Sequence, residues 1–475
     1  MKKTLCFITI AALLACLMAG CNKDNSPAAS LQAPSTAPTS QGAPSVPSPD
    51  ASQPTSAPAT QPATTPSTQA TTPATKPTTS QSSGQSTSNL IASGTCDNGA
   101  VNWKITKDGT LTVSGRGDIG EMNAYPWKKH FNDIKKIVVE GGITSIPKNA
   151  FSYLHEVTSV VIGEGVKTIG KYAIFACNKL ASVTIAASVE TIEDLALSSC
   201  AKLTEVKFVA GSQLKSIGRR AFSKSGIRAF DTPDNLHTID EQAFLECKQL
   251  ESVRLDSPLS TLGMQIFYNC TGLKSVYFGE AITGTGYQMF SGCTGVTKLE
   301  DYNPLVNDFT ELKGLTTLVI GGNRTSTSRY GYTNLSSVTI LSPITEIAGG
   351  AFIGCQSLTS FTIPETVTAI GSNAFRSCGI TSITIPNSVT TIGEAAFYSA
   401  LIKKITIPAS VTKLGKQAFY QSSLEEITFL GGCPIERMAQ VFPTGSVTAY
   451  YPANDATWTE DILKNYAQFV TWAAQ

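Results

Sequence analysis

Cysteine is the side chain in this sequence that offers the most chemistry. The 475 residues include 12 cysteines but only three histidines, His130, His155 and His237. Cysteine and histidine together can bind a metal ion or act as a nucleophile and its base. However, the sequence has no Cys-x-x-Cys pair, no histidine at a metal-site or catalytic-triad spacing, and no G-x-S-x-G, H-E-x-x-H or Walker motif. We therefore predict no catalytic residue, no metal site and no cofactor, and we do not expect an enzyme.

Seven cysteines share one position of a repeating pattern, three residues after an aromatic or aliphatic side chain. They are Cys177, Cys200, Cys247, Cys270, Cys293, Cys355 and Cys378. Ser225 and Ala400 occupy the same position in other copies, so the position requires a small side chain. A buried free cysteine behaves as a small apolar group. Disulfides are the alternative, because they suit an exported protein, but nine cysteines follow Cys21, an odd number. We favour structural thiols.

The glycine-rich segment 115–120 contains two known motifs. It has the form G-x-G-x-x-G, but no amphipathic helix follows it and an exported protein meets no dinucleotide, so we reject dinucleotide binding. The segment also contains Arg116-Gly117-Asp118, the tripeptide that integrins recognise, in which a cation and a carboxylate flank a glycine. The tripeptide could also occur by chance, or because a turn after a hairpin favours Gly and Asp. We keep Arg116, Gly117 and Asp118 as candidate ligand contacts.

Residues 1–20 predict an export signal. Two lysines precede an apolar run from Leu5 to Met18, which has the length of a signal-peptide core and is too short to span a bilayer. The run ends in Leu17-Met18-Ala19-Gly20-Cys21, which resembles a bacterial lipobox and predicts lipidation of Cys21. Secretion without a lipid is the alternative, and a similar motif ending at Cys16 competes less well.

Residues 21–92 predict a disordered tether. Between residues 25 and 90 the chain has 12 of its 24 prolines, only two charged residues and no aromatic side chain. Such a segment cannot bury enough apolar surface to fold, and its prolines favour extended polyproline stretches that together reach about 200 Å. The whole chain has a formal net charge of +1, which excludes a strong attraction to nucleic acid. We expect contact with a membrane only through the N-terminal lipid.

The region 143–435 repeats a pattern of 22 or 23 residues, as the spacing of Phe352, Phe375, Phe397 and Phe419 shows. We count about twelve copies of I-G-x-x-A-F-x-x-C-x-x-L-x-x-V-x-I-P, with an irregular stretch at 298–334. The alternating segment before the proline predicts a strand with one buried face. The Ala-Phe segment predicts one or two helical turns. One copy cannot close a core, so the copies must stack as a solenoid with a parallel β-sheet.

The regions that flank the repeats predict end caps. Residues 93–142 contain a β-hairpin signal, and residues 436–475 predict a small α/β cap. All four tryptophans lie in these two regions. Large aromatic side chains suit the task of covering the open ends of a solenoid core.

The outward positions of the predicted strands are mostly Ser and Thr, which strand propensity alone explains. Arg254, Tyr277, Lys404 and Glu426 depart from this composition and are candidate ligand contacts, because Tyr and Arg are common interface anchors. The irregular stretch adds Arg324, Arg329, Tyr330 and Tyr332 as candidates, with Tyr302 and Phe309 beside them. Its tyrosines could instead pack inside a bulging rung.

The repeat A-F-x-x-C-x-x-L-x-x-V-x-I-P resembles that of the BspA-like leucine-rich-repeat (LRR) family of bacterial surface proteins. The hairpin from Ser93 and the segment Tyr450-Tyr451-Pro452-Ala453-Asn454 resemble pieces that flank such repeats, so the resemblance covers about residues 93–475. It implies a right-handed solenoid on the extracellular face of a bacterial envelope. We expect a lipid-anchored monomer that binds an extracellular protein or glycan, with adhesion to matrix proteins, glycans or other cells as its function. A structural role in the envelope is the alternative.

Overall fold

The computed structural model describes residues 89–96, 99–306, 308–435, 440–466 and 468–475. The predicted signal peptide, the lipidation site Cys21 and the tether as far as residue 88 lie outside the described residues. Every described residue belongs to one unit, Ser82–Gln475. In the part that the structure describes, no helix combines the length and the apolar character that a membrane crossing needs.

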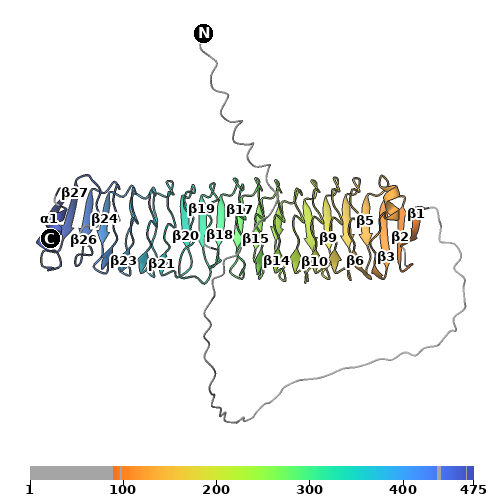
Figure 1. Cartoon of the computed structure of the whole chain (residues 1–475), viewed down its shortest axis with the longest axis horizontal. Helices are drawn as coiled ribbons and strands as arrows, with labels where there is room; N and C mark the ends of the chain where they lie inside the picture. Colours follow the sequence, from red (N-terminus) through yellow and green to blue (C-terminus); the bar gives the residue numbers. More distant parts are fainter. Residues whose placement is uncertain (1–88, 97–98, 307, 436–439, 467) are drawn as a thin grey trace, which may run out of the picture. The chain divides into compact units, whose positions relative to one another are not determined.

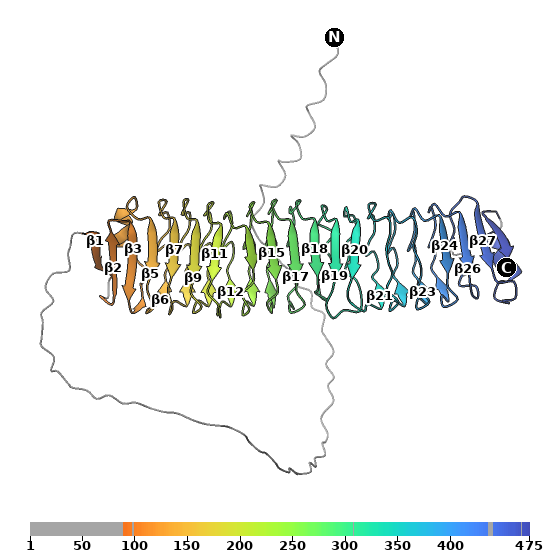
Figure 2. The same ribbon diagram turned by 180° about the vertical axis from the view of Figure 1, so that it is seen from behind.

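Each copy of the repeat forms one rung with three sides. The first side is a long strand, the second is a shorter strand, and the third is a series of turns. Each side forms hydrogen bonds with the same side of the next rung. Figures 1 and 2 show the strands side by side along this unit, from β1 (Leu90–Thr95) to β27 (Val447–Tyr451). The rungs make about 16 turns, which confirms the predicted solenoid with parallel sheets.

The first side consists of three sheets and the second side of two. The strands of the first side are β1 (Leu90–Thr95), β2 (Val101–Thr106), β3 (Thr110–Gly115), β5 (Lys136–Val139), β7 (Ser159–Ile162), β9 (Ser182–Ile185), β11 (Glu205–Phe208), β13 (Ala229–Asp231), β15 (Ser252–Leu255), β17 (Ser275–Phe278), β18 (Lys298–Asp301), β19 (Thr317–Ile320), β20 (Ser337–Ile340), β24 (Lys404–Ile407), β26 (Glu426–Phe429), β27 (Val447–Tyr451) and β28 (Val470–Ala474). Those of the second side are β4 (Gly117–Asp118), β6 (Ile143–Ile146), β8 (Thr168–Ile169), β10 (Thr191–Ile192), β12 (Ser216–Ile217), β14 (Thr238–Ile239), β16 (Thr261–Leu262), β21 (Glu346–Ile347), β22 (Ala369–Ile370), β23 (Thr391–Ile392) and β25 (Lys413–Leu414).

The third side differs from the predicted helical turns, and that prediction was wrong. Two residues of most rungs adopt left-handed backbone angles, for example Asn373 with φ 59° and Ser377 with φ 54°, and an α-helix cannot contain such residues. Between them, the N–H of Phe375 donates to the carbonyl of Ala396 in the next rung at 2.8 Å. The left-handed residues direct their own N–H groups to the next rung in the same way. The segment is therefore a third hydrogen-bonded ladder.

The phenylalanines of the repeat stack in register inside this third side. Centroid distances are 5.3 Å for Phe222 and Phe244, 5.5 Å for Phe352 and Phe375, and 5.4 Å for Phe375 and Phe397. All of these rings are fully buried. Near-parallel stacking fills this part of the core wherever successive rungs supply a ring at the same depth, and Ile174 and Leu197 occupy the position in two other rungs.

The repeated cysteines are free thiols in the structure. Each donates its S–H to a main-chain carbonyl of the preceding rung. For example, the Sγ of Cys270 lies 3.1 Å from the oxygen of Phe244, and the Sγ of Cys293 lies 3.0 Å from that of Phe267. The thiol therefore fills a small space and also satisfies a buried acceptor, which alanine at the same position cannot do.

The irregular stretch contains two shortened rungs. The starts of β18, β19 and β20 are 19 and 20 residues apart, at Lys298, Thr317 and Ser337. Phe309 and Tyr330 fill the aromatic position and stack at 5.8 Å, and Tyr330 stacks on the next phenylalanine at 5.9 Å. The sequence did not reveal these copies because their spacing and cysteine position differ from the others.

The ends of the stack are covered by aromatic residues, as expected. At the N-terminal end Trp127 lies in a 3₁₀ helix, Pro126–His130, is fully buried and packs on Trp103 at 6.3 Å. At the C-terminal end the helix α1 (Glu460–Asn465) connects β27 to β28, and Trp458 packs on Trp472 at 5.6 Å.

The interruptions of the strand ladders are staggered between the two strand-bearing sides. The first side is interrupted between β11 and β13, where β10, β12 and β14 of the second side pair continuously. The second side is interrupted between β16 and β21, where β17 to β20 pair continuously. The first side is interrupted again between β20 and β24, beside the continuous β21 to β25. Every interruption is thus bridged by a ladder on another side.

The aromatic stack predicts a large effect of a single truncation. Phe375→Ala should lower the free energy of unfolding by about 3–5 kcal/mol, because it leaves a cavity between two stacked rings. Thr384→Ala, at an exposed position of the next rung, is the control and should change it little. Chemical denaturation followed by circular dichroism measures both. Equal effects of the two substitutions would contradict the stacked core.

Cys378 predicts a stability contribution that depends on pH. Burial raises the pKa of Cys378 from 9.0 to about 12, so the folded chain keeps the proton that the unfolded chain loses. The free energy of unfolding should therefore fall as the pH rises from about 9 toward 12, by about 1.4 kcal/mol per pH unit for this group. Between about pH 8 and pH 10.5, the free energy of unfolding of Cys378→Ala, measured by urea denaturation, should fall less than that of the native chain. A loss equal to that of the native chain would contradict a protonated buried thiol.

Candidate functional site

Three side chains from successive rungs stack on the outward face of the long strands. Arg254 of β15 and Tyr277 of β17 are partners in register, and the guanidinium carbon lies 3.6 Å from the centre of the Tyr277 ring. Tyr302, directly after β18, stacks on Tyr277 with centroids 5.2 Å apart and planes inclined by 28°. Both rings are half-buried, so their edges remain accessible. We call Arg254, Tyr277 and Tyr302 the tyrosine patch.

Two glycines of the following rung make room for Tyr302. A Cβ at Gly321 would lie 2.2 Å from Cε1 of Tyr302, and a Cβ at Gly322 would lie 2.1 Å from its carbonyl oxygen. Gly322 also has φ +78°, a conformation that favours glycine. The shortened rung therefore holds the Tyr302 ring in one place rather than leaving it free on the surface.

The tyrosine patch presents a fixed cation beside phenol groups. The Nη2 of Arg254 lies 2.5 Å from Oδ2 of Asp256, and this hydrogen bond is the main cause that raises the pKa of Arg254. Partial burial is the main cause that raises the pKa of Tyr277, with Asp256 contributing. At neutral pH the patch therefore offers a charged guanidinium and a protonated phenol, both hydrogen-bond donors.

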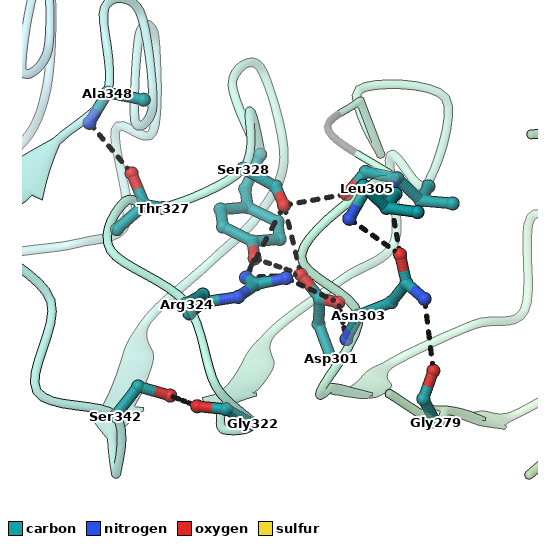
Figure 3. Close-up of polar contacts among 12 residues, drawn as sticks. Gly279, Asp301, Asn303, Leu305, Gly322, Arg324, Thr327, Ser328, Ser342 and Ala348 are labelled. Atoms are coloured by element: carbon teal, nitrogen blue, oxygen red, sulfur yellow. Dashed lines mark hydrogen bonds and ion pairs between the residues drawn. The ribbon is translucent and has the colours of Figure 1, made fainter. Parts of the chain in front are cut away.

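A buried polar network is centred on Asp301, the residue that directly precedes Tyr302 in the chain (Figure 3). Asp301 is fully buried and accepts from Nη1 of Arg324 at 2.9 Å and from Nη2 at 3.2 Å. The hydroxyl of Tyr330 donates to Asp301 at 2.5 Å, and that of Ser328 donates to it at 3.1 Å. Burial raises the pKa of Asp301, and the Arg324 guanidinium opposes this shift. The network gives the Tyr330 hydroxyl its partners inside the core.

Asn303 continues this network toward the preceding rung. Its Nδ2 donates to the carbonyls of Gly279 and Ile282 at 3.1 and 2.7 Å. Its Oδ1 accepts from the N–H groups of Leu305 and Val306, both at 2.8 Å. Asp301 and Asn303 thus fix the chain on either side of Tyr302, which is why that ring points outward.

Residues 122–236, 207–307 and 324–438 match the model of a family described as the BspA type leucine rich repeat region (6 copies). The matched segments cover more than half of the chain. This chain belongs to the BspA-type leucine-rich repeat family. A comparison with curated proteins found no match.

Several solved structures are similar to this BspA-type chain. One, from Bacteroides ovatus, is 24% identical, with 66% of this chain and 94% of that chain covered at a TM-score of 0.32. A leucine rich cell surface protein from Faecalibacterium prausnitzii is 20% identical, with 73% and 96% covered at 0.28. The pneumococcal vaccine antigen PcpA is 18% identical, with 82% and 98% covered at 0.33.

The structure of the BspA-type chain divides the candidate ligand contacts into surface residues and buried residues. It brings Arg254 and Tyr277 together, but Arg324 and Tyr330 are buried. These two residues are therefore corrected from surface contacts to core residues, because the Tyr330 ring fills the aromatic position of its rung. Arg329 is exposed and pairs with Asp308 at 2.8 Å. Tyr332 is 60% exposed and lies on the third side, away from the tyrosine patch.

The remaining candidates lie elsewhere on the surface. Lys404 and Glu426 face each other on β24 and β26 and form an exposed ion pair at 2.9 Å. Arg116 and Asp118 are exposed, and Gly117 and Asp118 form β4, which pairs with β6. The Arg-Gly-Asp tripeptide therefore belongs to the edge of a sheet rather than to a free loop.

Sequence reasoning did not identify Asp301 and Asn303. A signal was present, because Asp301 occupies the strand position that holds Ile, Leu or Phe in most other rungs. A carboxylate at a buried position requires a partner, and Arg324 is one of the cations that the same irregular stretch offers.

The buried pair predicts a strong effect of neutralising Asp301. Asp301→Asn should lower the free energy of unfolding by about 3 kcal/mol or more, because it leaves the Arg324 charge buried without its partner. Glu426→Gln is the matched control, and it should leave the denaturation midpoint nearly unchanged, because its pair faces solvent. If the two substitutions have the same effect on chemical denaturation, the network does not hold this part of the stack together.

Proposed function

We propose that this chain is an exported surface protein that adheres to an extracellular protein through the tyrosine patch. The observation that carries the proposal is the stack of Arg254, Tyr277 and Tyr302 on the exposed face. Tyr and Arg dominate the energetics of protein interfaces. A stack that is already ordered also loses little conformational entropy when a partner covers it.

The stacking favours a protein over a glycan as the ligand of this patch. Arg254 and Tyr302 cover the faces of the Tyr277 ring, and the Tyr302 ring lies against Gly321. A sugar ring would need a free aromatic face, whereas a protein surface can pack on ring edges and accept hydrogen bonds from the phenol and guanidinium groups. Glycans and the surfaces of other cells are alternative ligands for the adhesion test.

The predicted N-terminal segments support an extracellular location for this solenoid. The export signal at 1–20, the lipid on Cys21 and the tether at 21–92 would attach the repeats to a membrane and hold them away from it. No catalytic constellation occurs among the described residues, so binding is the activity that the solenoid supports best. A structural role within the envelope would use the same anchoring but would require no host ligand.

The proposal predicts that Tyr302→Ala impairs adhesion without unfolding the chain. The purified protein is screened against immobilised matrix proteins, glycans and whole bacterial cells. Binding to a matrix protein should weaken about 30-fold in Tyr302→Ala, which corresponds to about 2 kcal/mol. Thr384→Ala, an exposed residue of another rung, should bind like the native chain, and the thermal midpoints of all three proteins should agree.

Two outcomes would contradict this function. Binding that Tyr302→Ala and Thr384→Ala leave equally strong would exclude the tyrosine patch. If the native chain binds no matrix protein, glycan or cell, while affinity capture from its own membrane yields stable envelope partners, the structural role replaces adhesion.

A further inference from the structure

A pocket opens in the C-terminal cap, where the last turn segment of the solenoid meets the chain around α1. Figure 1 shows α1 beside β27 at this end of the stack. The pocket measures about 390 Å³, within the usual range for small-ligand sites. Its walls come from three parts of the chain, namely Tyr420 from one rung, Phe442 and Thr444 from the next, and Asn465 and Phe469 from the end of α1 and the segment before β28.

The packing of the cap holds the floor of this pocket in place. Phe442 is 4% exposed, and its ring meets the rings of Tyr466 and Trp472 edge-on, at centroid distances of 5.2 and 5.9 Å. The N–H groups of Phe469 and Val470 both donate to the carbonyl of Tyr466 at 2.9 Å. The rings and the main chain around the pocket are therefore fixed without a ligand, which lowers the entropic cost of binding.

Two of the rings that line the pocket are accessible. Phe469 is 37% exposed and contacts no other ring among the described residues. Tyr420 is half-buried and has one ring neighbour, Tyr398, at 5.8 Å. In the tyrosine patch, by contrast, both faces of the Tyr277 ring are covered. The face of an aromatic ring is electron-rich and attracts the polarised C–H groups of a sugar ring.

Three polar side chains of the pocket are neutral and have no partner. Thr444, Asn465 and Gln468 are exposed, and their side chains form no hydrogen bond with other described residues. No charged residue is among the described residues that line the pocket. An amide side chain offers donors on its nitrogen and an acceptor on its oxygen. Neighbouring sugar hydroxyl groups, which both donate and accept, can pair with such a group.

The same groups are less suited to other ligands. A proline-rich peptide also docks on aromatic grooves, but proline has no N–H, so such a peptide presents mainly carbonyl acceptors. The amide oxygens of Asn465 and Gln468 would then receive no donor. A charged ligand would find no opposite charge among the described residues of the lining. The chemistry of the pocket therefore favours an uncharged, hydroxylated molecule.

We propose that this pocket binds a neutral sugar residue of a glycan. The sugar ring would stack its C–H groups on the rings of Phe469 and Tyr420, and its hydroxyl groups would pair with the amides of Asn465 and Gln468. The site lies in the C-terminal cap, whereas the tyrosine patch lies at β15, β17 and the end of β18, so neither needs the other. The cap would then both cover the end of the core and hold a glycan.

The test measures binding of the purified full chain to immobilised neutral oligosaccharides of equal length, built from glucose, galactose, mannose or N-acetylglucosamine. At least one of them should bind. Phe469→Ala should weaken that binding about tenfold or more, because it removes the exposed ring face, and Phe469→Trp should retain most of it. Asn465→Ala should weaken it as well, because the paired amide is lost.

Phe131→Ala is the matched control, because it removes a ring that is 47% exposed in the N-terminal cap. It should leave sugar binding within about twofold of the native chain, and the thermal midpoints of all these variants should agree with that of the native chain, since each changes a surface side chain.

Any of three results would overturn the proposal. The first is that no neutral oligosaccharide binds at millimolar concentration. The second is that Phe469→Ala and Phe131→Ala weaken binding equally, which indicates nonspecific apolar contact. The third is that a polyproline peptide or a uronate oligosaccharide binds more tightly than every neutral probe, which indicates a peptide or an acidic sugar instead. Tyr302→Ala should leave sugar binding unchanged, so failure of this site and failure of the tyrosine patch are distinguishable.

Discussion

The stacking of one rung on the next is the constraint on which the rest of this structure depends. A rung of about twenty residues cannot bury its own apolar face, so its stability comes from its two neighbours. The rings of Phe375 and Phe397 stack at 5.4 Å, and the main chain bonds from rung to rung on all three sides. The Cys378 thiol adds a bond to the carbonyl of Cys355 in the preceding rung. Almost every feature of the repeat serves this contact between neighbours.

Staggered interruptions explain how the stack tolerates its irregular stretch. Where the second side is interrupted between β16 and β21, the first side pairs continuously from β17 to β20. The shortened rungs can therefore depart from the repeat without dividing the stack. The shortened rungs change two surfaces of the solenoid. Gly321 and Gly322 make room for Tyr302 on the outward face. On the interrupted second side there is a hollow that Arg324 helps to line. The buried Asp301–Arg324 pair connects the two.

Much of the fold could be predicted because equivalent positions in the different copies of the repeat have the same structural surroundings. The burial of Phe375 and the small-residue position of Cys378 follow from repetition alone, since many copies agree. Repetition could not show that the prediction of helical turns was wrong. The sequence of a five-residue segment does not reveal the left-handed angles at Asn373 and Ser377. The burial of Arg324 and Tyr330 was not evident either, because the shortened rungs have no copy of equal length with which to be compared. The stack of Tyr302 on Tyr277 likewise depends on the lengths of those rungs.

Hydrogen exchange of the native protein, read by mass spectrometry of its peptides, tests most directly whether the staggered ladders make one cooperative stack. The account predicts that peptides from the interrupted regions, around 206–230 and around 338–404, exchange as slowly as the neighbouring rungs and open together with them, because a continuous ladder on another side bridges each interruption. If the protein instead exchanges in separate blocks, with boundaries between β11 and β13 and between β20 and β24, the rungs are not held together in the way described here.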